Sequence, residues 1–339
     1  MKTDKNSAYL LLIAAFLFCA RGAVYGIVLH PDGEPNLATW ANRPDCNVVG
    51  RWSYNASCVA IAPNYIITTR HQGGSASSPV VIGGVTYTID DIWSHPTADL
   101  LVVKLHSANL SSYAALYSNT NEIGQETVIG GYGRGRETTL LKGPSQQPYG
   151  YTWSTDANDN NHTQRWCTNK VEGADTASNG YTSDVITADF DALGVGSTSY
   201  EGISAEYDSS GGWFIKDGSN WKVAGLVRAV TSHGEPWPDE GQSWFSPPDK
   251  LDAVRISSYV DWIEDKISPV CTGPVPGDFN GDCTIDIQDF DEFAGWWLRQ
   301  DCNKNNNWCQ GSDFDRDGDV NLVDFAELSA EWLYDYQQM

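Results

Sequence analysis

The stretch Ala62-Pro-Asn-Tyr-Ile-Ile-Thr-Thr-Arg-His71 continues from a turn into a short apolar run and ends on a histidine. An aspartate opens a second apolar run, Asp99-Leu-Leu-Val-Val-Lys-Leu105, and a serine follows an aspartate in Asp208-Ser-Ser-Gly-Gly212. Apolar runs this short, bounded by turn residues, recur from Ile27 to about Ile267 and are typical of an all-β barrel or sandwich. Residues 254–267 change to a roughly helical apolar spacing. We therefore expect an all-β domain that closes with one helix.

His71, Asp99 and Ser209 are the residue types that nucleophilic acyl transfer needs. A serine hydroxyl is a poor nucleophile at neutral pH, so an imidazole must take its proton, and a buried carboxylate must hold the correct imidazole tautomer. The three stretches resemble those of chymotrypsin-type and trypsin-like serine peptidases, in which histidine, aspartate and serine follow one another in this chain order. Gly130-Gly-Tyr-Gly133 resembles the mid-chain Gly-Trp-Gly turn of that family, and Tyr259-Val-Asp-Trp-Ile263 resembles its terminal helix.

This resemblance covers residues 27–267 and implies a chymotrypsin-like double β-barrel with a C-terminal helix. It also implies a serine endopeptidase with His71 as general base, Asp99 as the residue that orients it and Ser209 as nucleophile. The substrate would be a protein or a peptide. Two other interpretations stay open: an inactive barrel that serves as a binding protein, and an esterase that does not cleave peptides. Relatives that cut after Lys or Arg have an acid where this chain has Ile203, so cleavage after basic residues is not supported.

The surroundings of the serine depart from the family motif Gly-Asp-Ser-Gly-Gly-Pro. Tyr207 stands where a glycine normally presents one of two oxyanion-hole N–H groups, and glycine suits that position because it tolerates unusual backbone torsions. Ser210 competes with Ser209 as nucleophile. Choosing Ser210 would put Asp208 at the oxyanion-hole position, where its charge opposes the developing oxyanion. We therefore predict that Ser209 is the nucleophile.

The N-terminus has the features of a secretory signal peptide, with early lysines, an apolar run from Tyr9 to Ala20 and small residues after it. We assign residues 1–26 to this signal and expect a secreted protein, extracellular or at the cell surface, with the periplasm as the alternative. No later run is long and apolar enough to span a bilayer. The resembled peptidases become active when a new Ile-Val terminus folds inward and pairs with the aspartate before the nucleophile. Cleavage before Ile27 would create such a terminus, and cleavage after Gly22 is the alternative.

A duplicated motif follows a linker rich in proline and glycine at residues 268–277. The copy Asp278-Phe-Asn-Gly-Asp-Cys-Thr-Ile-Asp-Ile-Gln-Asp289 recurs as Asp313-Phe-Asp-Arg-Asp-Gly-Asp-Val-Asn-Leu-Val-Asp324. Oxygen-bearing side chains recur at the spacing that wraps a calcium ion in oxygen ligands. The predicted ligands are Asp278, Asn280, Asp282, Thr284, Asp286 and Asp289 in the first loop, and Asp313, Asp315, Asp317, Asp319, Asn321 and Asp324 in the second.

An apolar helix face is expected behind each loop. Its residues are Phe290, Phe293, Trp297 and Leu298 in the first copy and Phe325, Leu328, Trp332 and Leu333 in the second. This small α-helical unit of duplicated calcium loops, lacking an incoming helix, resembles a type I dockerin, and we assign it residues 278–339. The resemblance implies one calcium ion in each of two loops and a cohesin-like or cell-surface partner. Cys283 departs from the pattern, since it replaces the glycine expected at the sixth loop position.

The chain is strongly acidic, with 21 basic and 44 acidic residues and a net charge of -23. From Gly277 onward there are 15 acidic and 3 basic residues, so about half of the net charge lies in this module. We expect no binding to nucleic acid through phosphate neutralisation. An acidic, solvated tail is the alternative to calcium loops. Without cations the loop carboxylates repel one another, so the loop interpretation predicts that metal binding and folding are coupled.

The chain has eight cysteines, and removal of Cys19 with the signal leaves an odd number in an exported protein. Gln72 replaces the cysteine that usually follows the catalytic histidine of the family, so Cys58 needs another partner, and Cys46 is the nearest candidate. The cluster Cys271, Cys283, Cys302 and Cys309 allows three pairings and lacks the paired spacing of a zinc site. Cys167 is then the unpaired cysteine.

Overall fold

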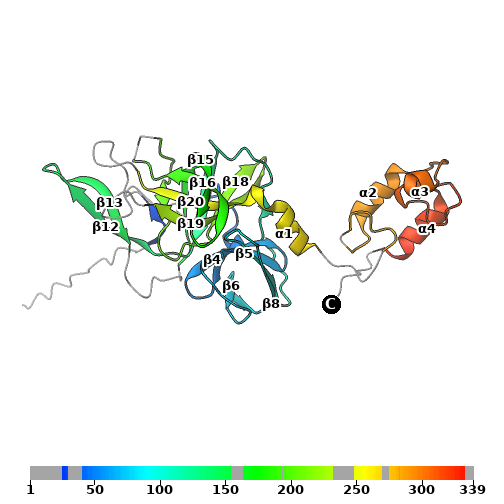
Figure 1. Ribbon diagram of the computed structural model, residues 1–339, viewed down its shortest axis with the longest axis horizontal. Coiled ribbons are helices and arrows are strands. Elements are labelled where there is room, and N and C mark those ends of the chain that lie inside the picture. The colour runs from blue at the N-terminus through cyan, green and yellow to red at the C-terminus, as the bar shows by residue number, and fades with distance from the viewer. Residues whose placement is uncertain are drawn as a thin grey trace, which may run out of the picture.

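The structure is a computed structural model that describes residues 25–29, 40–153, 163–192, 194, 196–231, 248–268, 275–281 and 283–332. Residues 1–24 of the predicted signal peptide lie outside the described residues. Strands run through the first part of the chain and helices follow it (Figure 1). No helix among the described residues is long and apolar enough to cross a membrane.

The first sheet has seven strands in the order β7-β6-β3-β4-β5-β9-β8, all antiparallel. They are β3 (Val49–Trp52), β4 (Ala56–Ala62), β5 (Tyr65–Thr68), β6 (Val80–Ile82), β7 (Val85–Tyr87), β8 (Ile89–Ser94) and β9 (Leu101–Leu105). Strand β4 is apolar at nearly every position because it has a core on both faces. Ala60 packs into the core inside this sheet, whereas Val59 and Ile61 pack into a core shared with the second sheet.

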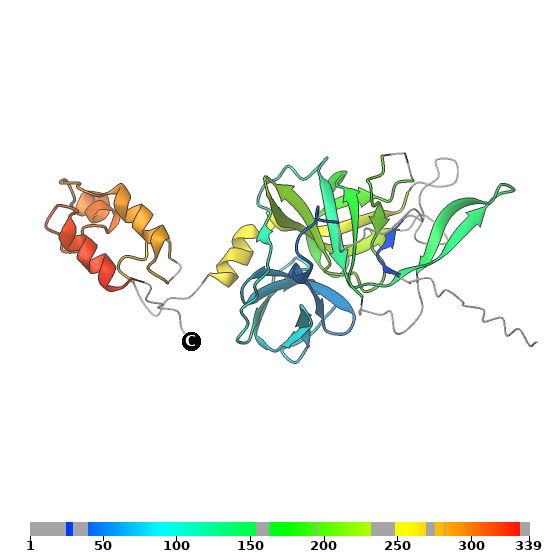
Figure 2. The ribbon, with the colours of Figure 1, turned by 180° about the vertical axis from the view of Figure 1, so that it is seen from behind.

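The second sheet has eight strands in the order β14-β11-β18-β19-β20-β16-β15, with β10 paired in parallel to β19. They are β10 (Ala115–Leu116), β11 (Glu126–Gly131), β14 (Arg165–Lys170), β15 (Gly173–Ser178), β16 (Thr182–Asp189), β18 (Gly212–Asp217), β19 (Asn220–Thr231) and β20 (Lys250–Arg255). The shared core contains Val59 and Val102 from the first sheet with Phe214 and Leu226 from the second. The two sheets therefore pack side by side (Figure 2), and the mostly β architecture is consistent with the expected chymotrypsin-like fold.

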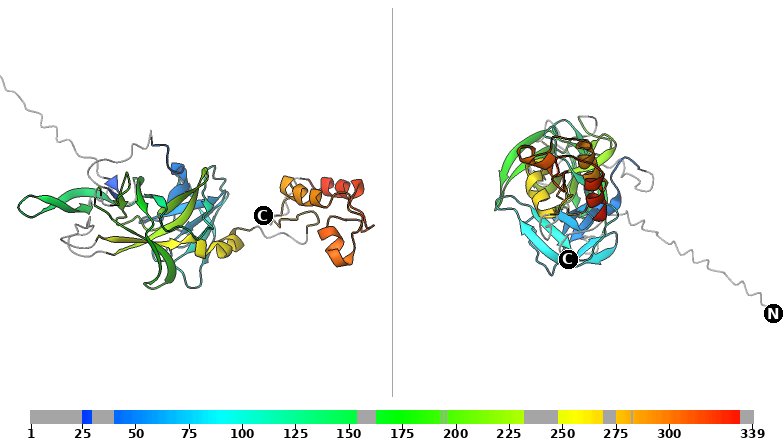
Figure 3. Two further views of the ribbon diagram at one scale, coloured as in Figure 1. Left: turned by 90° about the horizontal axis from the view of Figure 1, so that it is seen from above. Right: turned by 90° about the vertical axis from the view of Figure 1, so that its right-hand side faces the viewer.

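Two smaller sheets involve the N-terminal segment. Strand β1 (Tyr25–Gly26) pairs with β12 (Gly135–Lys142), which forms a hairpin with β13 (Gln147–Trp153). Strand β2 (Val28–Leu29) pairs with β17 (Gly202–Ile203). The β12–β13 hairpin extends away from the rest of the strands (Figure 3).

The helix that follows the strands is shorter than its sequence spacing predicts. Residues from Val254 were expected to be helical, but β20 continues to Arg255 and a 3₁₀ turn at Ile256–Ser258 precedes α1 (Val260–Ile267). The reason is that β20 pairs with β16 on one side and β19 on the other, so its backbone groups are already used in two ladders. Val254 and Ile263 nevertheless pack into the same core.

The helical unit contains α2 (Ile287–Gly295), α3 (Asn307–Gln310) and α4 (Leu322–Ala330). Asp286 and Asn321 cap α2 and α4, each in a capping box with the acid three residues later. Only part of the expected apolar face is buried. Phe293 and Leu328 are enclosed, whereas the exposed fractions are 37% for Trp297, 68% for Leu298, 37% for Phe325 and 39% for Trp332. Leu333 lies outside the described residues.

The predicted pairing of Cys46 with Cys58 is wrong, because both thiols are free. Cys58 packs into the core inside the first sheet, whereas Cys46 packs against the shared core, so the sheet separates the two side chains. Cys302 and Cys309 form a disulfide, and Cys283 is also disulfide-bonded. Cys167 is free and buried, as expected for the unpaired cysteine.

Candidate active site

His71 and Asp99 meet because they extend from neighbouring strands. His71 follows β5 and Asp99 precedes β9, and these strands pair with Thr68 opposite Leu101. The backbone N–H of His71 donates to Asp99 Oδ1 at 2.8 Å, and His71 Nδ1 lies 2.6 Å from Asp99 Oδ2. An ionised carboxylate can only accept, so this contact fixes the proton on Nδ1 and leaves Nε2 with a free lone pair.

Ser209 reaches the same place from the second sheet, on the loop between β17 and β18. Its Oγ lies 3.0 Å from His71 Nε2. The loop is tied to the first sheet, since the Ser57 N–H donates to the Ser209 carbonyl at 2.8 Å. The three predicted residues thus form one continuous chain from carboxylate to imidazole to hydroxyl, across the junction of the two sheets.

Ser210, the competing nucleophile, points into the interior. It is fully buried, whereas Ser209 is partly exposed. Its Oγ accepts from the Thr68 hydroxyl at 3.0 Å and the Thr69 N–H at 2.9 Å, and lies 2.6 Å from Thr69 Oγ1. The hydroxyl of Ser210 therefore ties the nucleophile loop to the end of β5, and no contact joins it to His71.

Asp208, directly before Ser209, is the buried anchor of this loop. Its Oδ1 accepts the Gly133 N–H at 2.7 Å, and its Oδ2 accepts the Ala205 N–H at 2.9 Å. Burial raises the pKa of Asp208 to about 6, although these donors and the Arg165 charge oppose the rise. The carboxylate occupies the space that a Cβ would need at Gly131 or Gly133, which explains the glycine-rich turn seen in the sequence.

Ile27 also contacts Asp208. Its backbone N–H lies 3.3 Å from Asp208 Oδ2, and its side chain is fully buried. The residue adopts φ of 50°, in the left-handed region that a β-branched residue rarely occupies. The backbone of Ile27 therefore contacts Asp208 even though its peptide bond to Gly26 is intact.

Tyr207 adopts φ of 71°, the left-handed conformation that a glycine would take without strain. The Arg134 guanidinium lies 5.0 Å above the Tyr207 ring, and its Nη2 lies 3.4 Å from the tyrosine hydroxyl. Among the described residues, the backbone N–H groups of Tyr207 and Ser209 donate no hydrogen bond. The fold itself therefore leaves these two N–H groups beside the nucleophile without an acceptor in the described part of the chain.

The segment that precedes the nucleophile loop ends in a buried, apolar residue. Ile203 is fully buried and belongs to the core of the second sheet. Two residues earlier, buried Glu201 accepts the Thr198 N–H at 2.9 Å and the Thr198 hydroxyl at 2.7 Å. Burial raises the pKa of Glu201 to about 7. Arg228, in the bulge of β19, is neutralised by Asp252, whose two oxygens lie 3.1 Å from its Nη1.

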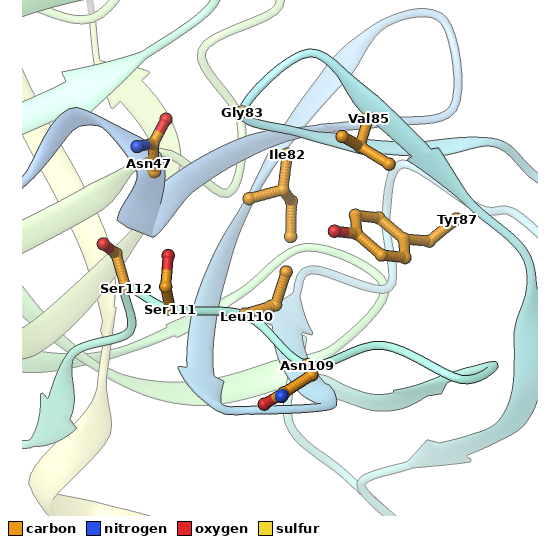
Figure 4. A pocket seen from close by; sticks show the side chains of 9 residues that line it. All are labelled: Asn47, Ile82, Gly83, Val85, Tyr87, Asn109, Leu110, Ser111 and Ser112. Atoms are coloured by element: carbon orange, nitrogen blue, oxygen red, sulfur yellow. The ribbon is translucent and has the colours of Figure 1, made fainter.

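A separate pocket of about 200 Å³ lies in the first sheet, beside the β6–β7 hairpin (Figure 4). None of the three predicted catalytic residues lines it. Its lining residues are Asn47, Ile82, Gly83, Val85, Tyr87, Asn109, Leu110, Ser111 and Ser112.

Three of the predicted calcium ligands in the second loop lie close together. Carboxylate oxygens of Asp313, Asp315 and Asp317 lie within 4.8 Å of one another, and Asp313 Oδ1 is buried without a hydrogen-bond partner among the described residues. A hard cation is the partner that this oxygen-only set fits. The last acids of the loops, Asp289 and Asp324, accept backbone N–H groups with both oxygens.

The other predicted calcium ligands differ in the contacts that they make. Asp278 accepts the N–H groups of Gly281 and Cys283, while Asp286 and Asn321 serve as helix caps. The Asp319 N–H donates to Asp317. Asp282 lies outside the described residues, and Asn280 and Thr284 belong to the same first loop.

The sequence did not indicate which residues hold Asp99 and Ser210 in place. The Asp99 N–H donates to Ser183 Oγ at 2.9 Å, from a strand in the second sheet. Thr69 was likewise overlooked, although it fixes Ser210. No local pattern marks either residue, because the sequence separation between donor and acceptor is 84 and 141 residues.

No protein-family model and no curated protein matches this sequence. Among solved structures, neuropsin, a serine protease expressed in the limbic system of mouse brain, is similar with a TM-score of 0.44 and 14% identity, covering 66% of this chain and 95% of that chain. The Rv3671c protease in its inactive form is similar with a TM-score of 0.42 and 14% identity, covering 65% of this chain and 89% of that chain.

Proposed function

We propose that this protein is a secreted serine endopeptidase that hydrolyses peptide bonds through an acyl-enzyme. The observation that carries the proposal is the unbroken contact chain from Asp99 through His71 to Ser209, with 2.6 Å and 3.0 Å between the polar atoms. These distances lie within the reach needed for proton transfer.

In the proposed reaction, Ser209 Oγ attacks the substrate carbonyl carbon while His71 Nε2 takes the hydroxyl proton. Asp99 stabilises the imidazolium that forms, and the N–H groups of Tyr207 and Ser209 stabilise the oxyanion. The imidazolium then protonates the leaving amine as the C–N bond breaks. Water, deprotonated by His71, releases the acid product and restores Ser209.

Ile203 supports a substrate preference that excludes basic residues at the cleavage site. An apolar, fully buried side chain offers no negative charge for a lysine or arginine. Arg228 does not supply a free positive charge either, because Asp252 neutralises it.

A fluorophosphonate probe tests the proposal, because only an activated serine is phosphonylated. The full-length protein should be labelled on Ser209, and His71→Ala should abolish the labelling without unfolding the chain. Absence of labelling in the folded protein would instead favour the inactive binding protein. Labelling with turnover of small esters but no proteolysis would favour the esterase.

We further propose that residues 278–339 bind calcium in both loops and tether the peptidase to a cohesin-like or cell-surface protein. The buried, unpartnered oxygen of Asp313 supports the metal site. An apolar groove of about 290 Å³ supports the tether, since α2 and α4 leave it open. Phe290, Phe293, Ala294, Trp297, Leu322 and Phe325 line it.

We propose in addition that maturation cuts the Gly26–Ile27 bond. The cut would turn the buried Ile27 N–H into an ammonium beside Asp208 and would relax the strained φ of Ile27. An ammonium at that distance stabilises the charged form of a buried carboxylate, so the nucleophile loop would become more firmly anchored.

A further inference from the structure

Arg70, directly before His71, makes contacts that are not part of the proton-transfer chain of Asp99, His71 and Ser209. Its Nη1 donates to the His95 carbonyl at 2.5 Å and approaches the Ala98 carbonyl at 3.4 Å. Both carbonyls belong to the short loop that ends at Asp99. One guanidinium therefore joins the segment that carries the base to the segment that carries the carboxylate.

The turn between β15 and β16 holds the same loop from the other side. The Tyr181 ring lies 4.2 Å below the Arg70 guanidinium, which keeps that group from swinging into solvent. The Thr182 N–H donates to the Thr97 carbonyl at 3.1 Å, and Ser183 accepts the Asp99 N–H at 2.9 Å.

His95 also stabilises the loop that ends at Asp99. Its Nδ1 accepts the N–H groups of Thr97 at 3.3 Å and Ala98 at 2.9 Å, so the ring is neutral with its proton on Nε2. Its ring packs edge-on against Tyr259 and Trp262, with 4.9 Å between ring centroids in each case. Burial, together with the Arg70 charge, lowers the pKa of His95, which keeps the accepting form at neutral pH.

We propose that Arg70 is a positioning residue for the Asp99–His71 pair, and that it holds the carboxylate at the distance that orients the imidazole. The inference rests on the proposed peptidase function. Arg70 does not touch the reacting atoms. A planar guanidinium can meet two carbonyls and an aromatic ring together, which a lysine ammonium cannot do with the same geometry.

Kinetics of Arg70→Ala give the first test. Misplacing a catalytic group by about 1 Å can cost roughly 100-fold, so we expect kcat to fall about 10- to 100-fold with KM changed less than about twofold. Arg70→Lys should retain part of the activity. Millimolar guanidinium should restore activity to Arg70→Ala and leave the parent protein unaffected, because the added cation can occupy the vacated place.

Arg255→Ala provides a matched control for loss of stability. Arg255 bonds to the Thr120 carbonyl and to buried Glu122, and in the part of the chain that the structure describes it contacts neither Asp99 nor His71. Its removal should lower the melting temperature, keep kcat within about twofold well below that temperature, and show no guanidinium rescue. If Arg70→Ala behaves like this control, the inference is overturned.

Proton NMR separates this inference from the proposed function. The Nδ1 proton that His71 shares with Asp99 should give a low-field resonance in the full-length protein and in Arg255→Ala, and should lose it in Arg70→Ala. A resonance unchanged in Arg70→Ala overturns the inference whatever the activity. If the parent protein resists the fluorophosphonate yet loses the resonance on substitution of Arg70, the peptidase proposal fails and the positioning inference holds.

Discussion

Changing Ser210 to alanine should lower stability without loss of reactivity, whereas changing Ser209 to alanine should abolish reactivity without loss of stability. Ser210→Ala removes the acceptor of the buried Thr69 N–H, and an unpaired buried donor costs about 1–3 kcal/mol. At roughly 2–4 °C per kcal/mol for a domain of this size, the melting temperature should fall by about 2–12 °C. Labelling by a fluorophosphonate should persist, because His71 and Ser209 keep their contact.

Ser209→Ala should show the opposite behaviour. Ser209 is partly exposed, and within the described residues its hydroxyl forms a hydrogen bond only with His71, so stability should change by less than about 0.5 kcal/mol while labelling disappears. Intact-mass spectrometry after labelling and a thermal melt of the same samples measure both quantities. Labelled Ser209→Ala together with unlabelled Ser210→Ala would refute the assignment. An unchanged melt for Ser210→Ala would refute the structural role given to its hydroxyl.

Three further outcomes are expected. Chelation of calcium should lower the calorimetric transition of the C-terminal helical unit and spare that of the β domain. Changing Asp278 and Asp313 together to alanine should mimic chelation, exposed Asp291→Ala serves as control, and equal melts with and without chelator contradict this. The pKa of Glu201 is raised from 4.5 to about 7. The contribution of this residue to the free energy of unfolding is therefore fully present below pH 4.5 and is lost as the pH rises through about 7. Glu201→Gln should therefore abolish a decline of about 3 kcal/mol in unfolding free energy over that interval, as measured by denaturant titration. N-terminal sequencing of the secreted protein should give Ile27, and a chain starting at Ala23 rules the maturation proposal out.

The meeting of His71 with Asp99 was predictable because each lies at the end of a short apolar strand, and the ends of paired strands meet. Ser209 could be preferred over Ser210 from the resemblance to the family motif together with electrostatics, since choosing Ser210 would put the Asp208 carboxylate at the oxyanion-hole position. The hydrogen bonds that make Ser210 inaccessible could not be predicted, because its partners lie at the end of β5 and directly after it, far away in the sequence.

The failed predictions have two physical causes, since spacing along the sequence reveals neither which face of a sheet a side chain occupies nor which segments pair through their backbones. Cys46 and Cys58 are close in sequence, yet a sheet separates them. Val254 has helical spacing, but pairing on both sides of β20 makes it a strand residue. The role of Arg70 could not be predicted from its neighbours in the sequence, because the carbonyls that it binds belong to another loop.

Cleavage of a diverse peptide library, read by mass spectrometry, tests the central claim most directly. The full-length protein and Ser209→Ala should be incubated side by side at equal concentration, after a melt has shown that both are folded. The account predicts new peptide termini that increase with time for the parent protein and are missing for Ser209→Ala, with no preference for Lys or Arg before the cut. No cleavage by the folded parent protein, or equal cleavage by both proteins, would contradict it.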